Sequence, residues 1–205
     1  MKREAADRDW IGMPFNVPPA FAAWRHCSAR DGFEIVFVDA AGADRCFDGA
    51  TTAVEAGDAW EVRYVVRLTG DWVTRSARIL GRSASGRREL TLEADGAGRW
   101  QIDGAAAPVL DGCLDVDLES SVLTNAFPVH RLELEVGQRA EAPAAYVRAR
   151  DLGVERLEQR YVRLDDDRGR RRYRYSAPAF GFECELRYDE RGLVLDYPGL
   201  AVRAG

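Results

Sequence analysis

Apolar and polar residues alternate along most of this chain with a period of two. Residues 59–68, AWEVRYVVRL, show it most clearly, and their apolar positions are Trp60, Val62, Tyr64, Val66 and Leu68. The residues between them include Glu61, Arg63 and Arg67. Successive side chains of a strand point to opposite faces, so this pattern predicts a β-strand with one buried face.

The same alternation returns near the C-terminus, in FGFECELRYDERGLVLDY (180–197). Its DERG segment predicts a hairpin turn between two strands. Further turn segments (DAAGAD, TGD, SASGRR, ADGAG and DDDRGR) divide the chain into ten or more short β segments. This spacing is typical of a sandwich or a rolled antiparallel sheet, and neither a sequence repeat nor a βαβ alternation is detectable.

One segment fits two structures. In VERLEQRYVRL (154–164), Val154, Leu157, Tyr161 and Leu164 also form a helical stripe. The turn DDDRGR and the segment RYRYS follow it directly, which favours a β-hairpin.

The chain of 205 residues is long enough for a sizeable core, and no linker divides it. Residues 1–20 are polar and then rich in proline, which predicts a flexible leader. Residues 21–205 are expected to form a single domain.

The composition excludes several classes of protein. A net charge of −5 argues against nucleic acid as a partner. No apolar run is long enough for a transmembrane helix, and no secretory signal is found at the start, so we expect a cytoplasmic protein. The cysteines, Cys27, Cys46, Cys113 and Cys184, form no CxxC pair and are expected to be reduced. We expect neither a cofactor nor a metal.

Some charged residues share strand faces with apolar ones. Arg75 lies between Val73 and Ala77 in DWVTRSARIL, and His130 shares a period-two face with Leu132, Leu134 and Val136. A buried charge needs a partner, and Glu34, Asp115 and Asp117 are candidates for Arg75. These residues either form a structural ion-pair network or line a cavity and hold the polar end of a ligand.

A catalytic interpretation is the alternative. Asp115 and Asp117 would lie about 7 Å apart on one strand face, a spacing compatible with paired carboxylates in sugar hydrolysis. His130 with Ser120, Ser121 or Cys113 has the residue types of a base and a nucleophile, but no nucleophile elbow surrounds them. A hydrolase or isomerase acting on a lipid or glycoside through Asp115, Asp117 and His130 is therefore the second hypothesis. A solid structural or partner-binding β-module is the third.

Several long blocks carry a resemblance to a known family. In chain order they are FAAWRH, GFEIVFV, TTAVEAGDAWEVRYVVRLTGDWVTRSARI, GRWQIDG, GCLDVDLESSVLTNAFPVHRLEL, EQRYVRL, YRYS and GLVLDYPGL. Over residues 21 to 203 the chain resembles the bacterial family described as "Putative glycolipid-binding". It departs from the family pattern at Ala126-Phe127, where Thr-Leu is usual, and at His130, where arginine is usual.

The resemblance implies an all-β, mainly antiparallel fold. A long curved sheet would roll into an incomplete barrel with an internal cavity and few helices, similar to periplasmic lipoprotein carriers. The expected function is non-catalytic binding of an amphipathic small molecule, a lipid or glycolipid. Aromatic and polar residues supply the candidate ligand-binding set: Trp24, Glu34, Tyr64, Trp72, Arg75, Asp117, Asn125, Arg131, Tyr161 and Tyr197.

Two of these residues have more specific expectations. Arg75, with the acidic group around Glu34 and Asp117, is expected to fix the polar end of the ligand. Asn125 precedes a proline-containing bend and is expected to tie down the backbone through an Asx-type hydrogen bond. The strand 114–118, the bend 124–128 and a following strand 130–136 would then form a corner that braces the roll.

Overall fold

A computed structural model describes residues 14–39, 42 and 44–205. Most of them belong to a 14-stranded antiparallel sheet with the strand order β10-β13-β14-β15-β16-β17-β1-β2-β3-β4-β5-β6-β7-β8. Its first half comprises β1 (Phe21–His26), β2 (Asp31–Asp39), β3 (Arg45–Glu55), β4 (Asp58–Leu68), β5 (Thr74–Ser83), β6 (Gly86–Ala94), β7 (Trp100–Ile102) and β8 (Ala105–Ala106). Its second half comprises β10 (Arg139–Glu141), β13 (Arg160–Asp167), β14 (Arg170–Ala177), β15 (Phe182–Tyr188), β16 (Val194–Tyr197) and β17 (Ala201–Arg203).

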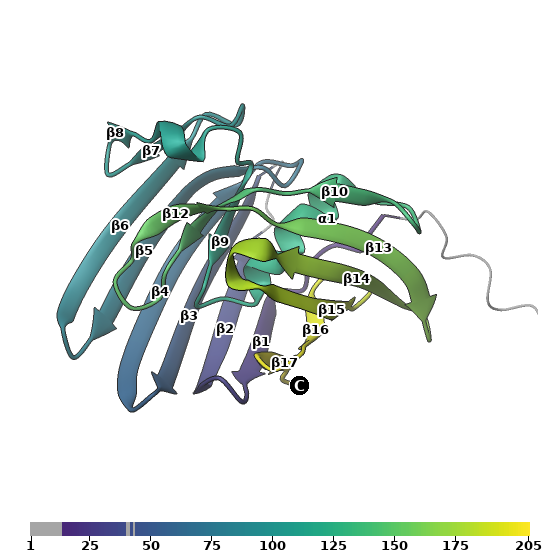
Figure 1. The fold of residues 1–205 in the computed structure, drawn as a ribbon, viewed down its shortest axis with the longest axis horizontal. Coiled ribbons are helices and arrows are strands. Elements are labelled where there is room, and N and C mark those ends of the chain that lie inside the picture. The colour runs from purple at the N-terminus through teal and green to yellow at the C-terminus, as the bar shows by residue number, and fades with distance from the viewer. Residues whose placement is uncertain (1–13, 40–41, 43) are drawn as a thin grey trace, which may run out of the picture.

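The two halves join where the first and last strands pair. Trp24 of β1 lies opposite Arg203 of β17, so the ends of the domain meet in the middle of the sheet. The sheet curves strongly but its edge strands, β8 and β10, do not pair with each other (Figure 1). The predicted incomplete barrel is therefore confirmed.

The inside of the roll is occupied by the chain itself. A three-stranded sheet, in the order β12-β11-β9, lies against the concave face together with one helix (Figure 1). These elements are β9 (Asp115–Leu118), β11 (Ala144–Val147), β12 (Val154–Leu157) and α1 (Ala126–Leu132), with short 3-10 turns η1 (Pro108–Leu110), η2 (Leu123–Asn125) and η3 (Pro178–Phe180). Every residue of β9 and β11 is buried, whereas Glu155 of β12 is exposed.

The alternation in the sequence predicts the sheet correctly. Trp60, Val62, Tyr64 and Val66 are all buried in β4, and the DERG segment turns between β15 and β16. The ambiguous segment 154–164 is extended and belongs to β12 and β13, with β13 and β14 forming the predicted hairpin. Helical periodicity there is coincidental, because β12 and β13 belong to different sheets.

The strand predicted over 130–136 is wrong. His130 lies in α1, and the chain leaves the helix at Glu133, whose φ of 44° is left-handed. The predicted bend at 124–128 is instead the end of η2 and the first turn of α1. Pro128 is its third residue, where the backbone nitrogen has no intrahelical partner to lose.

Residues 1–13 of the predicted leader lie outside the described residues. The part that is described packs on the domain: the Asn16 amide donates to the Glu190 carbonyl at 2.9 Å, and the Phe15 ring lies 4.6 Å from that of His130.

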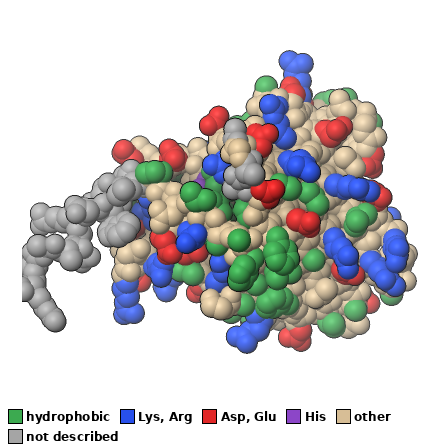
Figure 2. Space-filling model, turned by 180° about the vertical axis from the view of Figure 1, so that it is seen from behind, with side chains coloured by type: hydrophobic (Ala, Val, Ile, Leu, Met, Phe, Trp, Pro, Cys, Tyr) green, Lys and Arg blue, Asp and Glu red, His purple; other side chains and the backbone are tan. Residues whose placement is uncertain are grey.

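The outer face of β1 and β2 is unusually apolar. Phe21, Phe33 and Phe37 are 61, 43 and 57 % exposed there, and Phe21 lies directly opposite Phe37. Figure 2 shows hydrophobic side chains gathered on this side of the molecule. Among the residues described, no helix is both long and apolar enough to cross a membrane.

Candidate functional site

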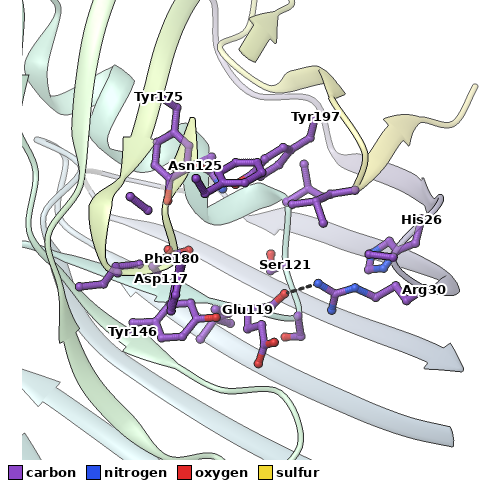
Figure 3. Close-up of a pocket in the computed structure, with 18 of the residues that line it drawn as sticks. His26, Arg30, Asp117, Glu119, Ser121, Asn125, Tyr146, Tyr175, Phe180 and Tyr197 are labelled. Atoms are coloured by element: carbon purple, nitrogen blue, oxygen red, sulfur yellow. Dashed lines mark hydrogen bonds between the residues drawn. The ribbon is translucent and has the colours of Figure 1, made fainter. Parts of the chain in front are cut away.

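A pocket of about 350 Å³ remains between the insert and the concave face of the sheet (Figure 3). We call it the main pocket. Its walls come from strands β1, β3, β9, β11, β12, β14, β15 and β16, the turns η2 and η3, and neighbouring loops. The lining residues are His26, Ala29, Arg30, Glu55, Asp117, Leu118, Glu119, Ser120, Ser121, Val122, Asn125, Tyr146, Leu157, Tyr175, Ala177, Phe180, Phe182, Tyr197 and Leu200.

One side of the main pocket is aromatic. The ring of Tyr175 meets that of Tyr197 edge-on at 6.2 Å, and Phe182 lies 6.2 Å from Tyr175. Tyr146 and Phe180 form a second pair, with ring centres 5.4 Å apart. Rings arranged in this way offer apolar faces to a ligand while their polar tips remain satisfied.

Asp117 lies at the base of this aromatic side (Figure 3). Its carboxylate accepts hydrogen bonds from Thr124 Oγ1 at 2.7 Å and from Gln159 Nε2 at 2.5 Å. The same Gln159 nitrogen contacts the Tyr175 hydroxyl at 3.0 Å. Burial raises the pKa of Asp117 to about 6, although the two hydrogen bonds oppose this change.

The other side of the main pocket is basic. Arg30 and His26 lie next to each other there, on the first strand and the turn that follows it (Figure 3). Arg30 is 9 % exposed, its guanidinium lies 5.3 Å above the Trp60 ring, and its Nη2 donates to the Glu119 carbonyl at 3.1 Å. Burial, with a smaller effect of Arg30, lowers the pKa of His26 to about 4, so the imidazole is neutral at pH 7.

Glu34 fixes the loop that forms the pocket floor. It is completely buried in β2, and its carboxylate accepts from Tyr64 Oη at 2.6 Å, Ser121 Oγ at 2.5 Å and the Val122 amide at 2.7 Å. Burial raises the pKa of Glu34 against these hydrogen bonds. Thr51 of β3 adds a bond to the Ser120 carbonyl at 2.7 Å. Glu34 and Tyr64 therefore position the pocket wall from behind.

Asp115 and Asn125 also make contacts within the protein. Arg131 donates to both carboxylate oxygens of Asp115, at 2.5 and 3.2 Å, and burial raises the pKa of Asp115 in spite of this pair. Asn125 caps no helix with its side chain. Its Oδ1 accepts from Tyr161 Oη and its carbonyl accepts from Tyr188 Oη, each at 3.1 Å, in place of the predicted Asx-type bond.

The predicted role of Arg75 is wrong. Strand β5 is irregular where it pairs with β4: Arg67 lies opposite Ser76 and Leu68 opposite Thr74, which leaves Arg75 as the extra residue. Such a bulge reverses the alternation of side chains. Arg75 is consequently exposed and donates to the Asp95 carbonyl at 2.6 Å, outside the main pocket.

His130 and Trp72 lie together at a different place. Their rings stack with centres 3.6 Å apart, and His130 Nε2 is 3.1 Å from the Arg191 carbonyl. Burial lowers the pKa of His130 to about 3. Both residues line a second pocket of about 250 Å³ with Phe15 and Arg45. His130 and Asp117 therefore do not share a cleft.

Comparisons with known proteins show which family this chain belongs to. Residues 21–203 match the family described as "Putative glycolipid-binding". The chain belongs to this family. The crystal structure of a DUF1089 family protein from Pseudomonas aeruginosa is similar, with 34 % identity over 97 % of this chain and 100 % of that one, and a TM-score of 0.73. None of the curated proteins matches.

A second solved structure is similar in fold alone. It is the beta-barrel-like protein of domain of unknown function DUF1849 from Brucella abortus, with 8 % identity and a TM-score of 0.54. The match covers 92 % of this chain and 95 % of that chain. A similar fold is thus found in a protein with little sequence identity to this chain.

The ten candidate residues separate into two groups in this family member. Asp117, Asn125 and Tyr197 line the main pocket. The other seven do not line it. Glu34 and Tyr64 lie behind its floor, Arg131 pairs with Asp115, and Tyr161 donates to Asn125. Trp72 lines the second pocket, Arg75 is on the surface, and Trp24 donates from Nε1 to the Val194 carbonyl at 2.7 Å.

The basic side was missed from the sequence. His26 shares its strand face with the apolar residues Ala22 and Trp24. A polar residue on an apolar strand face is the same signal that made Arg75 a candidate, and it could have identified this histidine. Arg30 follows a turn and carries no periodic signal. Within the described part of the chain, no group of three or more His, Cys, Asp or Glu residues is arranged to hold a metal ion.

Proposed function

We propose that this protein binds one amphipathic small molecule, a lipid or glycolipid, in the main pocket without covalent chemistry. The observation that carries the proposal is the division of the pocket into two sides. Aromatic rings of Tyr146, Tyr175 and Tyr197 form one side, and the polar groups of Arg30 and His26 form the other (Figure 3). An apolar pocket with a few placed polar groups is the usual design of a small-molecule site.

The size of the pocket limits the ligand. A volume of about 350 Å³ lies at the lower end of the roughly 300–1,000 Å³ typical of ligand sites. The insert of β9, β11, β12 and α1 fills the rest of the roll. A single acyl chain or ring system fits this space better than a lipid with several chains. The family description supports a glycolipid as the source of such a chain.

Catalysis at the main pocket is the second candidate function. The observation in its favour is Asp117, a buried pocket carboxyl whose pKa is raised to about 6, as in many general acids and bases. Its proposed partners are elsewhere, because Asp115 is paired with Arg131 and His130 stacks on Trp72. Binding without turnover is therefore the better supported function.

Native mass spectrometry of gently purified protein tests the proposal. We expect a bound small amphiphile in a one-to-one ratio with the chain, and its removal should lower the melting temperature, because a ligand that binds only the folded state stabilises it. Adding back a single-chain fatty acid or glycolipid should restore the melting temperature. Protein that is always empty and has no affinity for either class of amphiphile would contradict the proposal.

A further inference from the structure

Two neighbouring side chains in the main pocket leave buried polar atoms without a partner among the described residues. These are Nε and Nη1 of Arg30 and both ring nitrogens of His26. The two residues are only 9 and 6 % exposed. Folded proteins pair nearly all buried polar atoms, because an unpaired one costs about 1–3 kcal/mol and more when it is charged. Four such atoms at one end of a pocket therefore point to a ligand.

We propose that Arg30 and His26 form an anion subsite, which takes the carboxylate or phosphate at the polar end of the ligand. The proposal rests on the binding function argued above and adds the chemistry of the head group. An arginine presents its donors in a fixed fork that matches carboxylate and phosphate oxygens. A neutral imidazole beside it has one N–H donor to add.

The acidic residues near Arg30 do not take the place of this anion. Arg30 makes no ion pair with the described residues, and its one hydrogen bond is to the backbone carbonyl of Glu119. The Glu119 carboxylate accepts the Ala149 amide at 2.7 Å, and the Glu55 carboxylate lies 3.8 Å from Arg150 Nε. Asp117 is on the aromatic side with its own two donors.

The fold holds Arg30 rigidly in this position. Ser28 takes a left-handed φ of 59° in the turn, and the Cys27 amide donates to the Leu200 carbonyl at 2.9 Å. The Arg30 guanidinium lies over the Trp60 ring, a contact that stabilises a cation without using its N–H donors. The charge is thus placed before any ligand arrives, and a bound anion would not need to order it.

Titrations of delipidated full-length protein with matched ligands test the subsite. The ligands are decanoate, decanol, and inorganic phosphate, with the two chain-bearing ligands kept below their aggregation concentrations. We expect decanoate to bind at least about tenfold tighter than decanol, as a charge-assisted pair would produce. Arg30→Met should bring the two affinities together, and Arg30→Lys should keep part of the preference. The control is Arg25→Met, on the exposed face of the same strand as His26.

The outcomes separate the two proposals. Equal binding of decanoate and decanol to the wild-type protein would overturn the anion subsite and leave amphiphile binding intact. Phosphate stabilising the wild-type protein but not the Arg30→Met variant, with no binding of decanoate or decanol, would support the anion subsite and overturn the binding of an amphiphile. No binding of any of the three ligands would overturn both. The wild-type ratio needs no variant, so misfolding of Arg30→Met cannot obscure the result.

Discussion

The protonation of single residues already shapes this pocket. Asp117 is buried with two hydrogen-bond donors, yet burial still raises the pKa of its carboxyl to about 6. The folded protein therefore holds this proton more tightly than the unfolded chain, whose aspartates have a pKa of about 3.9. The stability that follows from this is fully present below pH 4 and is lost as the pH rises through 6.

Asp117→Asn should remove the loss of folding stability that accompanies the ionisation of this carboxyl as the pH rises. The amide keeps the size of the side chain, and Gln159 can rotate its own amide to accept from it. We expect the variant to gain stability over the wild-type protein as the pH rises from 4 to 7, by up to about 3 kcal/mol. Urea unfolding of both proteins across this range measures the difference. A difference that does not change with pH would contradict the assignment, and Asp31→Asn, at an exposed position, is the control.

At the scale of elements, three strands hold the loop 120–123 that closes the pocket floor. The Glu34 carboxylate of β2 accepts the Val122 amide of this loop, and Thr51 of β3 donates to the Ser120 carbonyl. Tyr64 of β4 donates to the Glu34 carboxylate. Gly49 of β3 makes room for the Tyr64 ring, because a Cβ there would lie 2.2 Å from Tyr64 Cζ. The floor thus depends on the absence of one side chain in the sheet behind it.

Gly49→Ala should displace the Tyr64 ring and break its hydrogen bond to Glu34. Overpacking and the loss of a buried hydrogen bond together predict a cost of about 2–4 kcal/mol in the free energy of unfolding. Chemical denaturation measures this cost. Gly81→Ala is the matched control in strand β5, where the atoms nearest to the new Cβ belong to the Leu152 side chain, at 3.2 Å. Equal costs for the two variants would show that Tyr64 is not the cause.

The elements that the sequence predicts correctly are the strands in which apolar and polar residues alternate. Glu34 does share its inward face with Val36 and Val38, as the pattern in β2 indicates. Two local events escape that pattern. The extra residue Arg75 reverses the alternation in β5. The helix α1 is only seven residues long and its first five are buried, so it has too little alternation between a buried and an exposed face to show a helical period. The pocket itself joins residues far apart in the chain, such as Arg30 and Tyr175, which no periodicity can pair.

At the scale of the whole molecule, the roll leaves an opening only where the insert does not fill it. Edge strands β8 and β10 stay apart, and the helix and the small sheet occupy the concave face between them (Figure 1). The main pocket is what remains, beside the turn that joins β1 and β2. Ala29 on this turn lines the pocket and is exposed, so we expect a change in the turn to affect binding without affecting the fold.

Ala29→Trp tests this consequence. Ala29 lines the pocket but is exposed on the turn, so a large ring can fill the opening without displacing the core. We expect the affinity for a single-chain fatty acid to fall at least about tenfold, because the ring occupies volume that the ligand needs. The melting temperature of the ligand-free protein should not change. Ala59→Trp, at an exposed position of β4 outside the pocket, should leave both quantities unaltered. If Ala29→Trp binds the fatty acid as tightly as the wild-type protein does, the ligand lies elsewhere, with the second pocket beside Trp72 as the next place to examine.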